Sequence, residues 1–442
     1  MDMNKDKKDK FEKFLFYFFI FLIPFQTRKI LFSSSLTDNF FEWGSGFLYL
    51  SDIILVGVFI LWIMRLLNKK SDFLKKSDLW LIGLFLIIGL SLITSVNLEL
   101  SIYQFIKLTE LILLFLYIRT SLEFLELNKI LKVFVISGIC QAVLAIVQFF
   151  NQASLGLKYI EAGIFNVNIP GTATFFVNGV KLIRAYGTAP HPNVLAVFLL
   201  VSIFCVYVLW LKNTKRSIIN YGLLVTAYGL LFLGLFLTFS RAVIIVFIFG
   251  SALFFLISFL KLKELKPKIF ILFLLFVACC LLFTVIFWPE FQARFLNISS
   301  GDQAISLRVY YNDIAVSVIK ERPILGLGVG NFTWYLFNNY RFQEFWLYQP
   351  VHNLYLLIVS EIGILGLVLF LVFIARILLK GLKQIRKIYV LCFMVCVLCF
   401  MILGLIDHYF WTIQQSRLLF WIILAIVSGF FLKKSPSSLL TE

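Results

Sequence analysis

Long apolar runs alternate with short polar segments along almost the whole chain. Twelve of these runs approach the length of about 20 residues that an α-helix needs to span the hydrocarbon core of a membrane. They are residues 12–27, 46–66, 78–96, 101–118, 130–150, 192–211, 217–238, 241–260, 268–288, 352–375, 388–406 and 416–432. The pattern predicts an all-α integral membrane protein with about twelve transmembrane helices.

The composition agrees with this pattern and excludes other classes of protein. Apolar residues make up 61% of the 442 residues, charged residues make up 14%, and the mean hydropathy is +0.96. Soluble domains are about half apolar and about a quarter charged. A soluble enzyme, a nucleic-acid-binding module and a disordered chain are therefore excluded, because none of them can hide this much apolar surface from water.

The basic residues predict the orientation of the helices. Of the 40 Lys and Arg residues, 27 fall in segments on one side of the predicted spans, and this side is expected to be cytoplasmic. Both termini then lie in the cytoplasm. The N-terminal segment also has the charge pattern of a signal peptide, but no small-residue cleavage site follows it, so a retained first helix is the better interpretation.

The same topology divides the chain into segments. Residues 1–150 form helices one to five, residues 151–432 form a second membrane domain, and residues 433–442 form a cytoplasmic tail. Two long segments, 151–191 and 289–351, lie on the outer side, where we expect short amphipathic helices. The second holds an apolar stripe of helical period that ends before Pro323 and is followed by a glycine-rich turn.

Polar residues gather at the predicted outer edge, and the first group precedes the sixth span. Arg184, His191 and Asn193 lie there, and Asn193 is placed to cap the helix. An arginine beside a helix N-terminus favours an anion. Arg241 follows a nearly absent turn between two spans, against the positive-inside bias. A capped helix entry and a snorkelling arginine would explain these positions without any function.

The second group belongs to the outer segment 289–351 and to the span that follows it. Arg308 and Arg322 flank the predicted amphipathic helix, and His352 and Asn353 begin the tenth span. A histidine at a membrane mouth can act as a general base near neutral pH. Glu361 lies deeper in the same helix and is expected to pair with another side chain, such as an arginine from another span.

The sequence shows no metal-ligand spacing and no catalytic triad. Cys392, Cys396 and Cys399 share a helix face, but small apolar packing residues explain them better than a metal site. We therefore expect neither a metal nor a cofactor.

The order of these motifs resembles the O-antigen ligase and polymerase family of bacterial membrane glycosyltransferases. The resemblance spans roughly residues 180–420, whereas the first five helices match only in hydropathy. The matching segments are Arg184, Gly187 and His191-Pro-Asn193; Thr238-Phe-Ser-Arg241; Arg308 with Arg322-Pro-Ile-Leu-Gly-Leu-Gly-Val-Gly-Asn-Phe332; His352-Asn353 with Glu361-Ile-Gly-Ile-Leu-Gly366; and Asp407-His408-Tyr-Phe-Trp411 with Gln414-Gln415.

This resemblance implies transfer of a glycan from a polyprenyl (undecaprenyl) diphosphate carrier to an acceptor hydroxyl at the outer face of the cytoplasmic (inner) membrane, without a metal. Carried onto this chain, Arg241 and Arg308 match the arginines that bind the diphosphate, and His352 matches the essential histidine. Arg184, His191, Asn193, Asn353, Glu361 and Arg322 are further candidates for binding substrate. The partners would be the lipid-linked donor, a glycan or lipid-glycan acceptor and the bilayer, and no nucleic acid.

Several activities remain open at this stage. Within the family the motifs fit a ligase acting on lipid A–core (lipopolysaccharide assembly), a repeat-unit polymerase and a protein O-oligosaccharyltransferase equally well. In a different class, a twelve-helix transporter or flippase of lipid-linked sugars has the same layout. A transporter places its ionisable residues near the bilayer midplane, so convergence of Arg184, Arg241, Arg308 and His352 at the outer edge would favour the enzyme.

Overall fold

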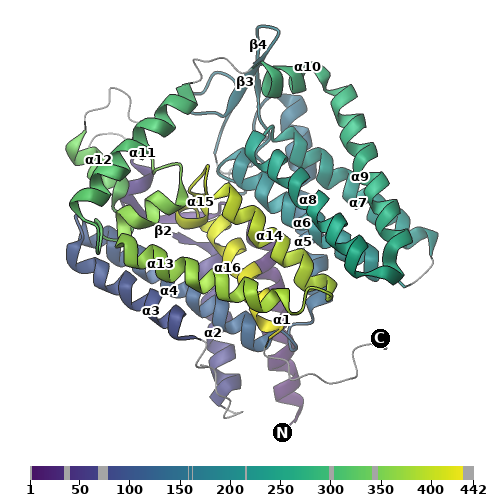
Figure 1. Ribbon diagram of the computed structural model, residues 1–442, viewed down its shortest axis with the longest axis horizontal. Helices are drawn as coiled ribbons and strands as arrows, with labels where there is room; N and C mark the ends of the chain where they lie inside the picture. The colour runs from purple at the N-terminus through teal and green to yellow at the C-terminus, as the bar shows by residue number, and fades with distance from the viewer. Residues whose placement is uncertain are drawn as a thin grey trace.

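The computed structural model describes residues 2–33, 40–67, 78–157, 159–161, 163–214, 217–297, 303–340 and 347–431. The predicted cytoplasmic tail, 433–442, lies outside these residues. Most of the described chain is helical (Figure 1). The start of α1 (Asp2–Leu22) and the β3–β4 hairpin (Thr174–Val177 and Val180–Ile183) lie at opposite ends of the molecule.

The remaining elements follow in chain order. In the first half they are β1 (Arg28–Ser33), η1 (Glu42–Gly44), β2 (Ser45–Tyr49), α2 (Leu50–Leu67), α3 (Leu79–Leu90), η3 (Ser91–Thr94), α4 (Leu98–Ser121), α5 (Leu127–Asn151) and α6 (Pro192–Lys212). In the second half they are α7 (Ile218–Leu237), α8 (Arg241–Lys261), η4 (Lys263–Leu265), α9 (Lys266–Ile286), α10 (Trp288–Phe291), the π-helix η5 (Gln292–Leu296), α11 (Gln303–Glu321), α12 (Phe332–Asn339), α13 (Leu354–Leu382), α14 (Ile388–Leu403), α15 (Tyr409–Thr412) and α16 (Gln414–Gly429).

The predicted spans coincide with helices, but not all of these helices are long enough to span. Each of the twelve apolar runs overlaps a helix of the described chain. Within the described residues, eight helices are long and apolar enough to cross a membrane, and the segments 79–94, 388–403 and 414–429 are shorter apolar helices. An all-α membrane protein is therefore supported, while the number of twelve spans and the orientation stay predictions.

Two β-hairpins correct the expectation of a purely helical chain. Residues 46–49, predicted as the start of the span 46–66, belong to β2, which pairs with β1. The hairpin is held by Arg28, whose guanidinium lies over the Phe47 ring at 3.8 Å and is paired with Glu42. The outer segment 151–191 holds the β3–β4 hairpin instead of an amphipathic helix. Its turn is Asn178-Gly179, both at positive φ, which is a strong hairpin signal that the hydropathy pattern does not reveal.

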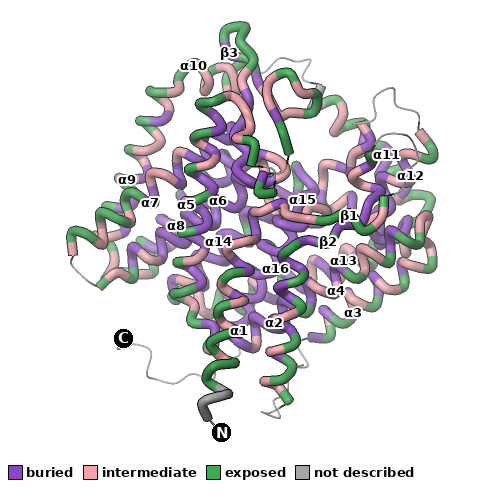
Figure 2. The backbone as a smooth tube through the Cα atoms, turned by 180° about the vertical axis from the view of Figure 1, so that it is seen from behind, coloured by how far each residue is buried: buried purple, intermediate pink, exposed green. Residues whose placement is uncertain are grey.

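The centre of the bundle consists of α6, α14 and α16 (Figure 2). Of the α6 span, 94% is buried inside the protein, whereas only 22% of the α9 span is buried. Because α6 is apolar on all sides, other helices can surround it without burying an unpaired polar side chain. It packs against α5, α7 and α14, and α16 packs against α4 and α14. The lipid-facing surface is therefore left to the outer helices.

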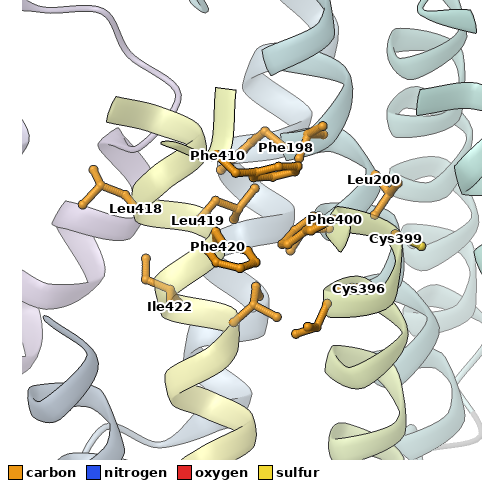
Figure 3. Packing of buried hydrophobic residues seen from close by; sticks show 14 of the residues in the cluster. Phe198, Leu200, Cys396, Cys399, Phe400, Phe410, Leu418, Leu419, Phe420 and Ile422 are labelled. Carbon is orange, nitrogen blue, oxygen red and sulfur yellow. The ribbon is translucent and has the colours of Figure 1, made fainter. Parts of the chain in front are cut away.

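Aromatic rings and thiols fill the contact between these central helices. Phe400 lies with its ring centroid 4.7 Å from Phe410 and 6.0 Å from Phe420 (Figure 3). Cys396 and Cys399 are fully buried on the same helix, and the Cys399 thiol contacts the carbonyl of Val246 at 3.7 Å. All seven cysteines are free and lie in membrane helices. The packing role expected for the cysteines of α14 fits this geometry.

A break in α13 brings the glycine-rich segment 323–331 into the bundle. Gly363 has φ 74° inside the helix, so the backbone turns away from helical geometry there. Backbone groups next to the break pair with the segment. Ile364 N donates to the Pro323 carbonyl, and Leu327 N donates to the Ser360 carbonyl, both at 2.9 Å. The segment predicted as a tight turn is therefore an inserted loop, which satisfies backbone groups that no water can reach in a membrane.

Candidate active site

A short turn between α7 and α8 holds two arginine side chains. Phe239 in this turn has a positive φ of 44°. Arg184 Nε donates to the Thr238 carbonyl at 2.7 Å, and Arg294 Nε donates to the Phe239 carbonyl at 3.1 Å. Arg241 follows directly as the first residue of α8. Three arginines from separate segments thus gather at one end of the bundle.

Asn193 connects these arginines to an acidic side chain. Its Oδ1 atom accepts hydrogen bonds from Arg184 at 2.5 Å and from the Ser240 hydroxyl at 2.8 Å. Its Nδ2 atom donates to Asp407 Oδ2 at 3.1 Å. Asn193 is therefore not the helix cap that its position predicted. His191 caps α6 instead, because its Nδ1 atom accepts the Asn193 backbone N–H at 3.1 Å, and this leaves the Asn193 side chain for the site.

His352 lies on the other side of Asp407. Its Nδ1 atom is 3.5 Å from Asp407 Oδ1, and its Nε2 atom is 3.1 Å from Gln349 Oε1. The imidazole rings of His352 and His408 have centroids 4.9 Å apart. The His352 side chain keeps 20% of its surface exposed, whereas His408 is buried. Of the two histidines, His352 is thus the one that an incoming molecule can reach.

The surroundings fix the charges of this group. Burial, together with the nearby charges of Arg294 and Arg241, lowers the pKa of Arg184 to about 9. Burial likewise lowers the pKa of His191 and of His408 to about 3. Near neutral pH the arginine is therefore charged while both histidines are neutral, which makes this end of the site suited to an anionic ligand.

Asp407 remains a carboxylate in the same surroundings. Burial raises the pKa of this carboxyl, but its contacts with His352 and with the backbone N–H of His408 contribute to holding the pKa below its usual value. A backbone hydrogen bond from His408 N at 2.9 Å also stabilises the ionised form. An ionised carboxylate beside His352 is the partner that a general base requires to keep its ring in one orientation.

Arg308 belongs to α11. Its positive charge is one of the causes that lower the pKa of His408, after burial and the charge of His352. Its Nε atom is buried without a hydrogen-bond partner among the described residues. The structure thus brings six of the sequence-predicted residues to one end of the bundle, namely Arg184, His191, Asn193, Arg241, Arg308 and His352.

Three predicted residues have different surroundings. Arg322 is exposed and donates to the Thr94 carbonyl at 3.2 Å, at the edge of α3. Asn353 caps α13, accepting the N–H groups of Tyr355 and Leu356. Glu361 is not paired with an arginine, because its Oε2 atom accepts hydrogen bonds from Gly330 N at 2.9 Å and Trp411 Nε1 at 2.7 Å.

A small cavity lies next to His408. Trp43, Gln104, Glu361, Trp411 and Thr412 are among the residues that line it, and its volume of about 30 Å³ has room for about one water molecule. Trp43 packs edge-on against His408 with ring centroids 5.6 Å apart, and His408 Nδ1 is 2.8 Å from Thr412 Oγ1. Indole rings with amide, hydroxyl and carboxylate groups are side chains that can contact a sugar, but the lining must move apart to admit one.

Asp407, His408, Arg294 and Ser240 were not among the residues selected from the sequence. Asp407 and His408 stood in one of the family-like segments, but nothing in the spacing indicated that they meet His352. Arg294 lies in the outer segment 289–351, where no pattern distinguished it. Only the packing of helix ends reveals these four.

Comparison with known proteins concerns the second half of the chain. Residues 226–371 match the family model described as O-antigen ligase. The match confirms the family resemblance and covers about a third of the chain, a narrower part than the motifs indicated. The O-antigen ligase match includes Arg241, Arg308 and His352 and ends before Asp407. No curated protein matches the sequence.

The family and the helices together support a coarse description. The chain has the character of a multi-pass bacterial membrane protein with an O-antigen ligase-like domain, which points to a membrane glycosyltransferase-like enzyme of surface polysaccharide assembly. Lipid-linked glycans and the bilayer are the molecules that this family implies.

Proposed function

We propose that this protein transfers a glycan from a polyprenyl-diphosphate carrier to an acceptor hydroxyl at the outer face of the cytoplasmic membrane. The observation that carries the proposal is the contact between His352 and Asp407 next to the arginine group of Arg184, Arg241 and Arg294. It unites a positioned base with concentrated positive charge, which are the two parts that such a transfer needs.

His352 is the proposed general base. With a proton on Nδ1 directed at Asp407, the Nε2 atom carries the lone pair and faces the exposed side, where Gln349 now lies. The acceptor hydroxyl takes the place of the Gln349 side chain and gives its proton to Nε2 as its oxygen attacks C1 of the donor sugar. General base catalysis of this kind contributes about 10²–10⁴-fold to a rate.

The arginines are proposed to bind the leaving group. As the acceptor oxygen bonds to C1, the bond from C1 to the diphosphate oxygen breaks, and its electron pair stays on the diphosphate. Fixed guanidinium groups in a site with little water stabilise the added negative charge. Arg308 and Arg241 match the family's diphosphate-binding residues, and Arg184 and Arg294 add charge from the turn 238–240.

The reaction draws its energy from the donor linkage. Direct attack at C1 inverts the configuration of the transferred sugar. NMR of the product linkage tests this step, and a retained anomer contradicts it.

The cavity lined by Trp43 and Trp411 is the proposed place of the acceptor sugar. It adjoins His408, whose ring centroid is 4.9 Å from that of His352, so an acceptor admitted there by movement of the lining side chains would lie near the proposed base. The same arrangement serves a ligase, a repeat-unit polymerase and a protein O-oligosaccharyltransferase, which differ in the molecule that carries the acceptor hydroxyl.

The position of the charges favours an enzyme over a transporter. The arginines and His352 gather where α6, α8 and α13 begin and α7 and α14 end. Deeper in the bundle, Lys107 contacts both Asp52 and Glu110, which resembles a structural connection between α2 and α4 more than a transport path. The buried Glu361 and Arg417 are hydrogen-bonded to the neutral side chains of Trp411 and Gln104.

A complementation assay in the native host tests the proposal. We expect His352→Ala to abolish mature surface glycan while the lipid-linked donor accumulates in the outer leaflet, with the protein level checked by blot. His352→Gln is the matched variant, which keeps the hydrogen bond to Gln349 but has no basic nitrogen. Normal surface glycan with either variant contradicts the role of His352, and donor trapped in the cytoplasmic leaflet indicates a flippase instead.

A further inference from the structure

Three side chains at the site can bind one ion together. His352, Asp407 and His408 each offer one ligand atom, and these atoms all lie within 4.8 Å of one another. The atoms are two imidazole nitrogens and a carboxylate oxygen, which is a donor set that suits zinc and neighbouring divalent transition metals. The sequence spacing gave no sign of this set, because His352 comes from the start of α13 and the other two from the turn after α14.

The Nδ1 atom of His352 and the Asp407 carboxylate face each other. Nδ1 lies 3.5 Å from Asp407 Oδ1. Nδ1 is buried and has no hydrogen-bond partner among the described residues, and the Nε2 atom of the same ring lies 3.1 Å from Gln349 Oε1. In the tautomer with the proton on Nε2, the Nδ1 lone pair faces the carboxylate, and a cation between the two atoms removes their repulsion.

The tautomer of His408 adds a third lone pair. The Thr412 hydroxyl donates to the His408 carbonyl at 3.4 Å, so its oxygen accepts the Nδ1 proton of His408 at 2.8 Å. The Nε2 atom of His408 is then unprotonated, and it lies 3.9 Å from Asp407 Oδ1. A ligating histidine in a metal site commonly donates its other ring N–H in this way, which fixes the direction of the ligand nitrogen.

Asp407 is held in place by two hydrogen bonds that do not involve the histidine rings. Its Oδ2 atom accepts from Asn193 Nδ2 at 3.1 Å, and its Oδ1 atom accepts from the backbone N–H of His408 at 2.9 Å. Ligand atoms in a tetrahedral zinc site lie roughly 3.3 Å apart. The two histidine nitrogens lie 3.5 Å and 3.9 Å from Asp407 Oδ1, and all the ligand atoms lie within 4.8 Å of one another, so the rings must move inward to reach this geometry.

We propose that His352, Asp407 and His408 bind a divalent transition-metal ion such as Zn²⁺, and that the bound ion inhibits the protein. The ion takes the position between Nδ1 and Asp407 that a proton holds in the active form. With the metal on Nδ1, the neutral imidazole must keep its proton on Nε2, so it cannot accept one from an acceptor hydroxyl. The inhibition rests on the proposed function, whereas the binding does not.

The charge of Arg308 near His408 opposes a cation. The affinity is therefore expected to be lower than that of a structural zinc site with four ligands. A reversible, inhibitory site fits this balance better than a permanently filled one.

Metal titration of the purified full-length chain in detergent tests the binding. The chain itself has three histidines, and a polyhistidine tag would bind Zn²⁺ as well, so the protein must be purified with another tag. We expect one Zn²⁺ per chain by calorimetry and the visible absorption bands of tetrahedral Co²⁺. His408→Ala and Asp407→Asn should each weaken binding by about 100-fold or more, since each removes a direct ligand.

His191→Ala is the matched control for this titration. His191 is a buried histidine of the same site, but its Nδ1 atom caps α6 and it is not part of the three-ligand group. It should therefore leave the affinity for Zn²⁺ unchanged. Equal binding by wild type and His408→Ala overturns the site, as does equal loss in His408→Ala and His191→Ala.

The inhibition is tested in a transfer assay with and without ZnCl₂, followed by a chelator. We expect loss of transfer at the zinc concentration that fills the site and full recovery with the chelator. Whatever transfer His408→Ala retains should be insensitive to zinc at that concentration. Stimulation by zinc, or equal sensitivity of wild type and His408→Ala, overturns the inhibitory role. If the proposed transfer itself fails, the titration still decides whether the metal binds.

Discussion

The Nδ1 atom of His352 lies 3.5 Å from the Oδ1 atom of Asp407. The histidine precedes α13 and the aspartate follows α14, and the same aspartate is linked through Asn193 to Arg184. This line of contacts makes Asp407 a positioning residue for a base on one side and for an arginine on the other.

We expect Asp407→Asn to lower the transfer rate by about 100-fold, because an amide cannot stabilise the imidazolium that forms when His352 accepts a proton. The substitution keeps a group of the same size next to Asn193. The measurement is a transfer assay in detergent with purified donor, in which kcat falls while KM for the donor changes little. A rise in KM at constant kcat would instead assign Asp407 to donor binding.

A pair of arginine variants separates the site from its surroundings. Arg308→Ala should lower the rate by about 10²–10³-fold, since it removes a charge beside the reacting groups. Arg322→Ala should change the rate by no more than about 3-fold, because Arg322 is exposed. Within the described residues, its side chain donates a hydrogen bond to the backbone carbonyl of Thr94. Similar losses in both variants would contradict the placement of the diphosphate near Arg308.

The break in α13 predicts a strong effect at one glycine. A Cβ atom on Gly363 would lie 1.8 Å from the Ile324 carbonyl oxygen, and its φ of 74° is unfavourable for alanine. Gly363→Ala should therefore yield little folded protein by size-exclusion chromatography. Gly222→Ala is the control, because nothing lies within 4 Å of the Cβ position there and the residue is helical. Equal yields of the two variants would show that the inserted loop is not required for folding.

The buried pair of Lys107 and Asp52 predicts a loss of stability. Lys107→Met leaves the Asp52 carboxylate without its partner in the bundle and should cost about 3–5 kcal/mol. Thermal unfolding followed by intrinsic fluorescence should show a clearly lower Tm. The double variant Asp52→Asn with Lys107→Met removes both charges of this pair and should recover part of this loss, because Glu110, the second partner of Lys107, remains. A double variant as unstable as Lys107→Met would contradict the pairing.

The sequence by itself indicated that the protein lies in a membrane, where its helices are, and which residues are the main candidates for the active site. Apolar runs of nearly constant length leave no alternative to membrane helices, since each must satisfy its backbone hydrogen bonds internally. Motif order then selected Arg241, Arg308 and His352, which the family match covers. The two hairpins escaped this method because hydropathy does not distinguish a short strand from the end of a helix, although Asn178-Gly179 carried a local turn signal.

Tertiary structure alone decided which of these residues meet. Asn193 has the sequence position of a helix cap, yet His191 caps α6 and Asn193 bridges Arg184 to Asp407. Arg322 is as prominent in the motifs as Arg308 but faces the edge of α3. The physical reason is that local sequence sets the period and ends of a helix, whereas the contacts between helix ends depend on how the helices pack. The three possible metal ligands, from two distant segments, became visible for the same reason.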